Sequence, residues 1–194
     1  MEDFQIDLMI GSGTGSTSVK MDIAKFTLVG ATTKLSSLSN PLRDRFGNVM
    51  KLDFYDVPDL AKIVARSFQI LGGIEVSGEA IDSIAMRSRG TPRIANRYVK
   101  ILRDYATTGR HIGTRSECDD IFEAFGVDES GLDILDRKLL VHLRDTFGGR
   151  PTGLSTLASV VGEEVATIED VVEPFLLQMG LIERTPRGRQ ITRK

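Results

Sequence analysis

The sequence is poor in residues that cross-link proteins or bind metals: it has one cysteine and two histidines among 194 residues. The single thiol, Cys118, cannot form an intrachain disulfide, which fits a reducing cytoplasm. His111 and His142 lie far apart in the sequence, so we predict no metal site with nitrogen and sulfur ligands. No run approaches the roughly 20 apolar residues that span a bilayer, and no basic-then-apolar leader opens the chain, so we predict no membrane association.

A phosphate-binding loop of the pattern Gly-x-x-x-x-Gly-Lys-Ser/Thr is also missing from the sequence. The glycine-rich run GSGTGS (11–16) is the nearest approach, but no lysine follows Gly15 at the required place. We therefore interpret this run as the tip of a β-hairpin. No apolar strand ends in the Asp-Glu pair that would hold magnesium, so the chain alone is expected to bind and hydrolyse ATP poorly.

The net charge of −2 hides an uneven distribution of charge along the chain. Residues 184–194 carry five basic side chains and no acid, which leaves 20 basic against 27 acidic residues in the remainder. A small basic end on an acidic body indicates either contact with a polyanion or a solvated tail, and charge alone leaves both open.

The first 52 residues have the periodicity of β-strands. Apolar residues alternate over 4–10 and again over 19–23, on either side of the predicted hairpin tip. Residues 26–31 form an apolar run that we predict to be a buried strand ending in Thr32 and Thr33.

Residues 53–128 change to helical spacing and predict a small domain of four helices. Asp56 and Ser77 are expected to cap the first two helices, Pro92 to begin the third, and the Thr-Arg-Ser-Glu run at Thr114 to cap the fourth.

Residues 129–194 predict three helices followed by a hairpin that turns at 186–188, which is the order of a winged-helix module. Ser155 and Thr167 are the expected caps of the second and third helices. The third helix carries Glu169, Asp170 and Glu173, which make a poor surface for phosphates.

Two short strings hold arginines at suggestive positions. Asn40-Pro41-Leu42-Arg43-Asp44-Arg45-Phe46-Gly47 places two arginines two residues apart, and an arginine can neutralise charge on a γ-phosphoryl group across a subunit boundary. Gly90-Thr91-Pro92-Arg93 puts Arg93 in the first turn of a helix, where an anion is favoured. From spacing alone, ordinary surface arginines, solvated or paired with acids, are the favoured interpretation of both strings.

Taken together, five strings resemble the RuvB family in order and spacing, and the resemblance covers essentially the whole chain. It implies an α/β remnant of an AAA+ ATPase core (1–52), a small all-α lid domain (53–128) and a winged-helix domain (129–194). The family's phosphate-binding lysine and magnesium-binding acids have no counterpart here, so the chain is expected to start beyond them. The five strings are GATTK (30–34), NPLRDRFG (40–47), GTPRIANR (90–97), DRKLL (136–140) and RTPRGR (184–189).

The resemblance implies roles for individual residues. Thr33, or Thr32 if the register differs by one, would sense the γ-phosphate of ATP. Arg45 would be the finger that reaches a neighbouring subunit's ATP, with Arg43 supporting it, and Arg93 would be the second sensor.

The resemblance also implies partners. Val19 and Met21 on the first hairpin would contact RuvA, and the basic wing would contact the DNA backbone of Holliday-junction arms without sequence preference. The intact protein would use ATP and Mg²⁺ as a hexameric ring and join a complex with RuvC. The wing residues concerned are Arg184, Arg187 and Arg189.

Three other functions compete with a branch-migration motor. A non-enzymatic winged-helix regulator would bind specific sequences through the third helix, and it would leave Arg45 and Arg93 unexplained. A clamp-loader-like AAA+ subunit shares the sensor and finger strings but fits the terminal RTPRGR string less well. An isolated fragment that binds or inhibits a complete RuvB is the third.

Overall fold

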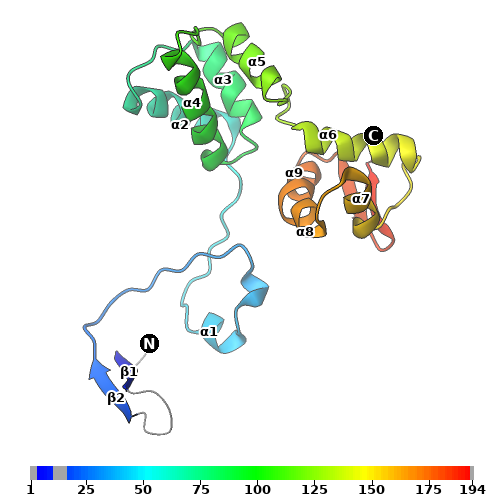
Figure 1. Cartoon of the computed structure of the whole chain (residues 1–194). Helices are drawn as coiled ribbons and strands as arrows, with labels where there is room; N and C mark the ends of the chain where they lie inside the picture. The colour runs from blue at the N-terminus through cyan, green and yellow to red at the C-terminus, as the bar shows by residue number, and fades with distance from the viewer. Residues whose placement is uncertain (1–3, 11–16, 193–194) are drawn as a thin grey trace. The chain divides into compact units, whose positions relative to one another are not determined.

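The computed structural model describes residues 4–10 and 17–192, which fall into two compact units, Met1–Lys51 and Leu52–Lys194. The first unit contains the strands β1 (Gln5–Ile10) and β2 (Thr17–Asp22), a short 3-10 turn (Leu35–Ser37) and the one-turn helix α1 (Asn40–Asp44) (Figure 1).

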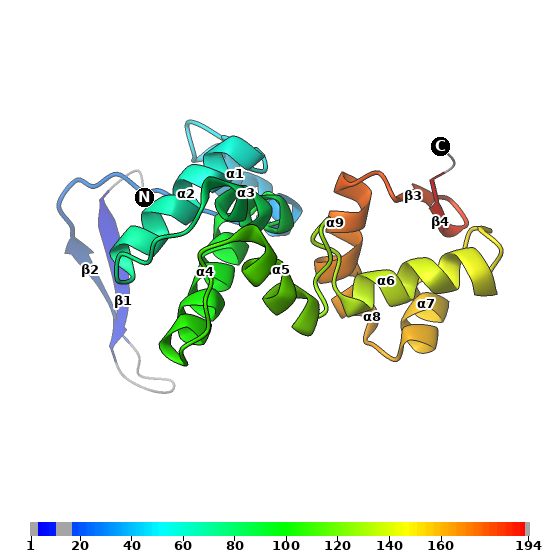
Figure 2. The same ribbon diagram turned by 90° about the horizontal axis from the view of Figure 1, so that it is seen from above.

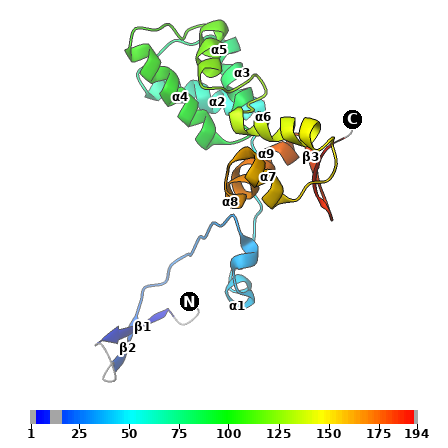
Figure 3. The ribbon, with the colours of Figure 1, turned by 45° about the vertical axis from the view of Figure 1, so that its right-hand side comes forward.

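The strands β1 and β2 pair as an antiparallel hairpin, as their alternating apolar residues predict (Figure 3). The predicted tip at 11–16 lies outside the described residues. Ile6 pairs with Met21 and Leu8 with Val19, so that four apolar side chains share one face of the hairpin. Each of the four is 41 to 47% exposed.

The predicted strand at 26–31 is wrong. These residues form no regular secondary structure, and Val29 is 87% exposed. A strand needs a neighbour for its backbone N–H and C=O groups, and no strand of the described residues pairs with this segment. Its apolar composition indicates burial, yet Phe26, Leu28 and Val29 are 45 to 87% exposed.

The second unit begins with four helices, α2 (Val57–Ile70), α3 (Gly78–Arg87), α4 (Pro92–Thr107) and α5 (Arg115–Ala124). The predicted caps are confirmed: Asp56 accepts a hydrogen bond from the amide of Asp59, and Ser77 accepts one from that of Ala80. Thr114 and Glu117 form a reciprocal capping box. Local hydrogen bonds therefore set where these helices start.

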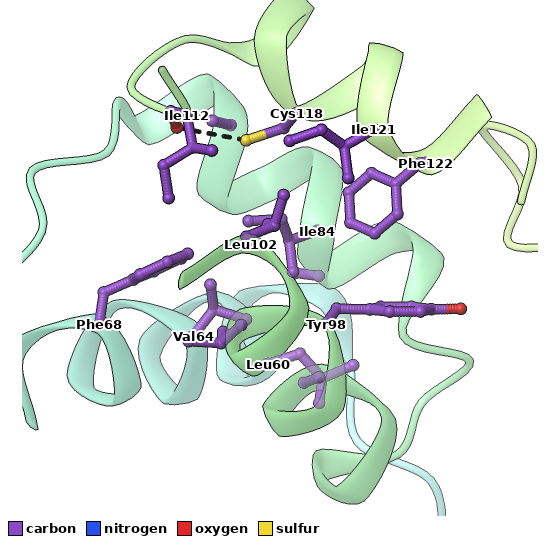
Figure 4. Close-up of a cluster of buried hydrophobic side chains, with 14 of the residues drawn as sticks. Leu60, Val64, Phe68, Ile84, Tyr98, Leu102, Ile112, Cys118, Ile121 and Phe122 are labelled. Carbon is purple, nitrogen blue, oxygen red and sulfur yellow. Dashed lines mark hydrogen bonds between the residues drawn. The ribbon is translucent and has the colours of Figure 1, made fainter. Parts of the chain in front are cut away.

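The four helices enclose one apolar core (Figure 4). Leu60, Val64 and Phe68 line one side of α2 at helical spacing and are all buried. Cys118 lies at the other end of this core, where its Sγ is 3.3 Å from the carbonyl oxygen of Ile112. Burial raises the pKa of the Cys118 thiol to about 12, so this cysteine is an inert core residue.

The rest of the second unit is a winged helix (Figure 2). Its first helix, α6 (Ile134–Val141), continues into the π-helical segment His142–Thr146 and is followed by α7 (Leu154–Val161). A further helix comprises α8 (Val165–Thr167), the π-helical segment Ile168–Val172 and α9 (Glu173–Gln178). The strands β3 (Ile182–Thr185) and β4 (Gly188–Ile191) then form the wing.

Two predicted caps in the winged helix are wrong. The residue before α7 is Gly153, and Ser155 lies inside the helix. The next helix starts after Glu164, and Thr167 has helical backbone angles of −61° and −45°. A capping residue needs an extended backbone, so Thr167 cannot act as one.

Candidate nucleic-acid interface and nucleotide-sensing residues

Two salt bridges that share one carboxylate hold the wing to the body of the winged helix. Arg184 on β3 and Arg189 on β4 are direct cross-strand partners, so both side chains lie on one face of the hairpin. Arg184 Nε donates to Glu173 Oε1 over 2.5 Å, and Arg189 donates from Nε and Nη2 to the two carboxylate oxygens over 2.9 and 3.0 Å. Two of the three predicted DNA contacts are therefore already engaged with a carboxylate.

Glu173 is only 1% exposed, although the sequence had suggested an acid on the helix surface. Burial alone would raise the pKa of Glu173, but the hydrogen bonds from Arg189 and Arg184 outweigh burial and hold the pKa below its ordinary value. The carboxylate is thus charged at neutral pH and cancels part of the positive charge of the wing. Glu173 therefore holds the wing in place and does not add a negative charge to the exposed surface of the third helix.

Arg187 sits at the turn of the wing and differs from the other two arginines. Its side chain is exposed and forms no ion pair with the part of the chain that the structure describes. The turn itself is tightly held, because Gly188 has a φ of +133° and lies against the carbonyl group of Thr152. Thr152 and Arg189 exchange backbone hydrogen bonds of 2.8 and 2.9 Å, which form an isolated β-bridge beside the wing. Arg187 is therefore a cation presented on a rigid support.

The candidate sensor and finger residues of the first unit are exposed or half-buried. Thr32 Oγ1 accepts a hydrogen bond of 3.0 Å from the amide of Lys34, whereas the neighbouring Thr33 is exposed at the end of the segment. Arg43 donates from Nη2 to Asn40 Oδ1 over 2.5 Å inside α1, and Arg45 lies exposed at the end of that helix. The Arg43 side chain is thus held within α1, and no described residue forms a hydrogen bond with the side chain of Thr33.

The structure brings the GATTK and NPLRDRFG strings together within the first unit. A Cβ atom placed on Gly30 would lie 3.4 Å from Cζ of Phe46, the residue that follows Arg45. The segment that carries the candidate sensor thus passes the end of α1, where the candidate finger begins.

Arg93 occupies the second position of α4, directly after Pro92. It is exposed and forms no ion pair with any described residue. The first-turn amides of a helix have no intrahelical partner, so an exposed arginine there can act with them on one anion. This position is the one that the sequence predicted.

Arg89, four residues before Arg93, joins the lid to the winged helix and was not predicted from the sequence. Arg89 Nε donates to the carbonyl of Gly131 over 2.8 Å, and its Nη2 donates to Asp133 over 3.1 Å and to Asp136 over 2.6 Å. Its guanidinium carbon also lies 4.5 Å from the ring centroid of Phe175. One side chain therefore joins the α3–α4 loop to the winged helix. The only signal in the sequence was its position beside the GTPRIANR string.

Asp136 is the buried partner of Arg89, with none of its side chain exposed. Burial raises the pKa of Asp136 to about 6, although hydrogen bonds from the Asp133 amide and from Arg89 act in the opposite direction. Asp136 also completes a capping box with Asp133 at the start of α6. Its side chain thus both starts a helix and holds the inter-domain arginine.

Three of the predicted site residues carry hydrogen-bond donors. Thr33, Arg45 and Arg93 are donors suited to phosphate oxygens. However, no group of three or more His, Cys, Asp or Glu side chains in the described ranges 4–10 and 17–192 is arranged to hold a metal ion such as Mg²⁺. Nor is any helix in these ranges long and apolar enough to cross a membrane.

Three family models match consecutive parts of the chain. The Holliday junction DNA helicase RuvB P-loop domain matches residues 1–52, the RuvB AAA lid domain residues 55–128, and the RuvB C-terminal winged helix domain residues 129–194.

Solved structures agree with these matches. The Thermotoga maritima RuvB Holliday junction branch migration motor is 44% identical over 88% of this chain, with a TM-score of 0.78. A point mutant of the same protein is 42% identical over 98% of this chain, with a TM-score of 0.79. This chain spans 57 and 60%, respectively, of the length of those two chains. With three consecutive RuvB domains matched and the AAA+, lid and winged-helix architecture in place, the chain belongs to the RuvB family.

Proposed function

We propose that this chain supplies the DNA grip and the nucleotide-responsive residues of an ATP-dependent motor for Holliday-junction branch migration. In the intact motor Thr33 would sense the γ-phosphate, with Thr32 as the alternative. Arg45, supported by Arg43, would act on a neighbouring subunit's ATP, and Arg93 would be the second sensor. ATP and Mg²⁺ would bind mainly to parts of a motor that this sequence lacks, in a ring of six subunits in the cytoplasm.

The observation that carries this proposal is the construction of the wing. A rigid hairpin presents Arg187 to solvent, while Arg184 and Arg189 flank it and are anchored to Glu173. Arg184 remains 55% exposed despite its ion pair, so it too can reach a phosphate. A short hairpin that carries cations suits contact with the DNA backbone, which is the same in every sequence. A motor that moves along DNA requires such contacts.

The first hairpin supports a second part of the proposal. Its apolar face, formed by Ile6, Leu8, Val19 and Met21, is 41 to 47% exposed along both strands. Contiguous exposed apolar surface is typical of a protein–protein contact. We propose RuvA as its partner, within an assembly that also includes RuvC.

Binding to a labelled four-way junction, a duplex and a single strand across a salt series tests the DNA grip. The variant to use is Arg187→Ala, because removing Arg189 or Arg184 would also remove one of the two partners of the buried Glu173. Loss of one phosphate contact should lower the slope of log affinity against log salt by about 0.9 for duplex DNA. Arg103→Ala is the matched control, since it removes the same charge from α4 in the lid.

Duplex binding that is independent of sequence and weakened by Arg187→Ala, but not by Arg103→Ala, supports the motor's grip. Selection of one duplex sequence, or binding that ignores Arg187, would favour a winged-helix regulator instead.

A further inference from the structure

The loop between α3 and α4 has an unusual backbone at Arg89. Its φ is +53°, and the next residue, Gly90, has a φ of +68°. A left-handed arginine is disfavoured unless surrounding contacts hold it in place. Thr91 Oγ1 donates to the Arg89 carbonyl over 3.2 Å, and the Gly90 carbonyl accepts a hydrogen bond of 2.9 Å from the amide of Tyr55. The loop is therefore constrained on both sides, and its shape aims the Arg89 side chain at the winged helix.

The winged helix receives Arg89 in a site made from three of its segments. Gly131 belongs to the connection that follows the lid, Asp133 and Asp136 begin α6, and Phe175 lies on α9. Arg89 is 11% exposed and Asp136 is not exposed at all. The planar guanidinium donates along its edge to oxygens while its face covers a ring, which a lysine cannot reproduce.

Close backbone packing surrounds this contact. A Cβ atom on Gly131 would lie 2.7 Å from the carbonyl oxygen of Arg87, at the end of α3. A Cβ atom on Gly90 would lie 3.2 Å from Nε2 of Gln178, at the end of α9. At Gly131 only a glycine allows this approach to the backbone of α3, so the lid and the winged helix are in direct contact here.

The same helix that receives Arg89 also holds the wing. On α9, Phe175 lies under Arg89, and Glu173, two residues earlier, binds the two wing arginines. On the other side, Arg89 lies four residues before Arg93, at the beginning of α4. The wing arginines and Arg89 therefore contact the same helix, α9, at Glu173 and Phe175, and the backbone of the α3–α4 loop connects Arg89 to Arg93.

We propose that Arg89 is a positioning residue that locks the winged helix to the start of α4, so that load on the wing reaches the second sensor Arg93. The proposal rests on the proposed function for its consequence, because transmission matters only if the wing grips DNA. The lock itself is a property of this chain and can be measured without nucleotide.

Distance measurement between two spin labels tests the lock in the full chain. The labels replace exposed residues, Lys100→Cys on α4 and Glu163→Cys after α7, in a Cys118→Ala background. We expect a single narrow distance distribution in this parent and in the matched control Arg103→Ala. Arg89→Ala should lose the narrow distribution, Arg89→Lys should restore part of it, and Asp136→Asn should broaden it.

Amide hydrogen exchange in the same proteins without labels supplies the second readout. Slow exchange at Leu102 and Leu143 reports that both cores are folded in each variant. Duplex binding should slow exchange over residues 90–98 in the parent protein, and Arg89→Ala should lose this protection even if the duplex still binds.

A narrow distance distribution that persists in Arg89→Ala would overturn the lock. If Arg89→Ala does not fold, Arg89→Lys and Asp136→Asn decide the question by the same distance measurement. Failure of every protein to bind duplex would contradict the proposed function, whereas the effect of Arg89 on the distance distribution would still stand.

Discussion

The two units of the chain differ sharply in what they bury. Among the residues of Met1–Lys51 whose burial the structure describes, none is buried. The unit Leu52–Lys194 holds two apolar cores, one among α2–α5 and one in the winged helix. Both units carry apolar residues at regular spacing, so periodicity alone does not produce a core.

The reason for the difference lies in how each kind of element covers its apolar face. Helices that follow one another closely can pack together, and α2–α5 do so within about 70 residues. A hairpin or single strand has only one layer and needs a second one to cover it. Leu28 and Val29 therefore remain 45 and 87% exposed, although their run of apolar residues is typical of a buried strand.

The largest expected effect is the loss of unfolding free energy caused by a core substitution in the second unit. Leu102→Ala should destabilise this unit by about 2 to 5 kcal/mol, because it leaves a cavity among α2–α5. Leu8→Ala in the first hairpin should change unfolding by less than about 0.5 kcal/mol. Denaturant unfolding followed by circular dichroism measures both, and equal losses would mean that the first unit has a core of its own.

Breaking the buried ion pair of the wing should have the next largest effect. Glu173→Ala removes the acceptor of Arg184 and Arg189, and we expect a loss toward the low end of about 3 to 5 kcal/mol, because both arginines retain some contact with water. Glu169→Ala, on the exposed face of the same helix, is the control.

The Glu173 ion pair should also depend on pH. The pKa of Glu173 is lowered in the folded protein, so its stabilisation is present above the ordinary value of 4.5 and is lost as pH falls through the lower folded pKa. Thermal unfolding of the wild type between pH 7 and 3 should show this loss, and Glu173→Ala should not. A wild type and variant with the same pH profile would contradict the ion pair.

Asp136 should give a pH effect of the opposite sign. Its folded pKa of about 6 exceeds the ordinary 3.8, so the folded protein holds this proton more tightly than the unfolded chain does. The corresponding stabilisation is complete below about pH 3.8 and is lost as pH rises through about 6, a change on the order of 1 to 3 kcal/mol.

The measurement for Asp136 is the difference in unfolding free energy between wild type and Asp136→Asn at pH 4 to 7. The difference should move against the wild type as pH rises, since only the wild type must ionise a buried carboxyl group. A constant difference across this range would show that Asp136 titrates normally.

The smallest effect on stability is expected at the hairpin face. Val19→Ser with Met21→Ser exposes no new core and should change unfolding of the second unit by less than about 0.5 kcal/mol. Titration with RuvA should nevertheless show weaker binding, because the apolar contact area is lost. Lys20→Ser, on the opposite face of β2, is the control, and unchanged binding by the double variant would remove the hairpin from the partner surface.

Much of the second unit could be predicted because its signals are local. Asp56, Ser77 and Thr114 cap helices through hydrogen bonds to residues three positions away, and those bonds form wherever the helix lies. The wing turn at 186–188 could likewise be predicted from its proline and glycine. The caps assigned to Ser155 and Thr167 failed because helix starts there are set by Gly153 and Glu164 instead.

The candidate site shows where sequence reasoning stops. The sequence placed Arg93 in the first turn of a helix, and α4 has it there. It could not reveal that Glu173 turns inward to bind the wing, because that contact joins residues 11 and 16 positions apart. Arg89 escaped notice for the same reason, since its partners lie more than 40 residues away.

The sequence by itself determined the helices of the lid, the two hairpins and the positions of the arginines, since short-range hydrogen bonding and apolar spacing govern these features. Only the tertiary structure decided which arginine side chains are exposed to solvent and which are bound by a carboxylate. The charge on an arginine does not depend on its surroundings, but its availability does. The buried carboxylates of Glu173 and Asp136 form salt bridges with the arginines that contact them. Arg187, on the wing, is instead exposed to solvent.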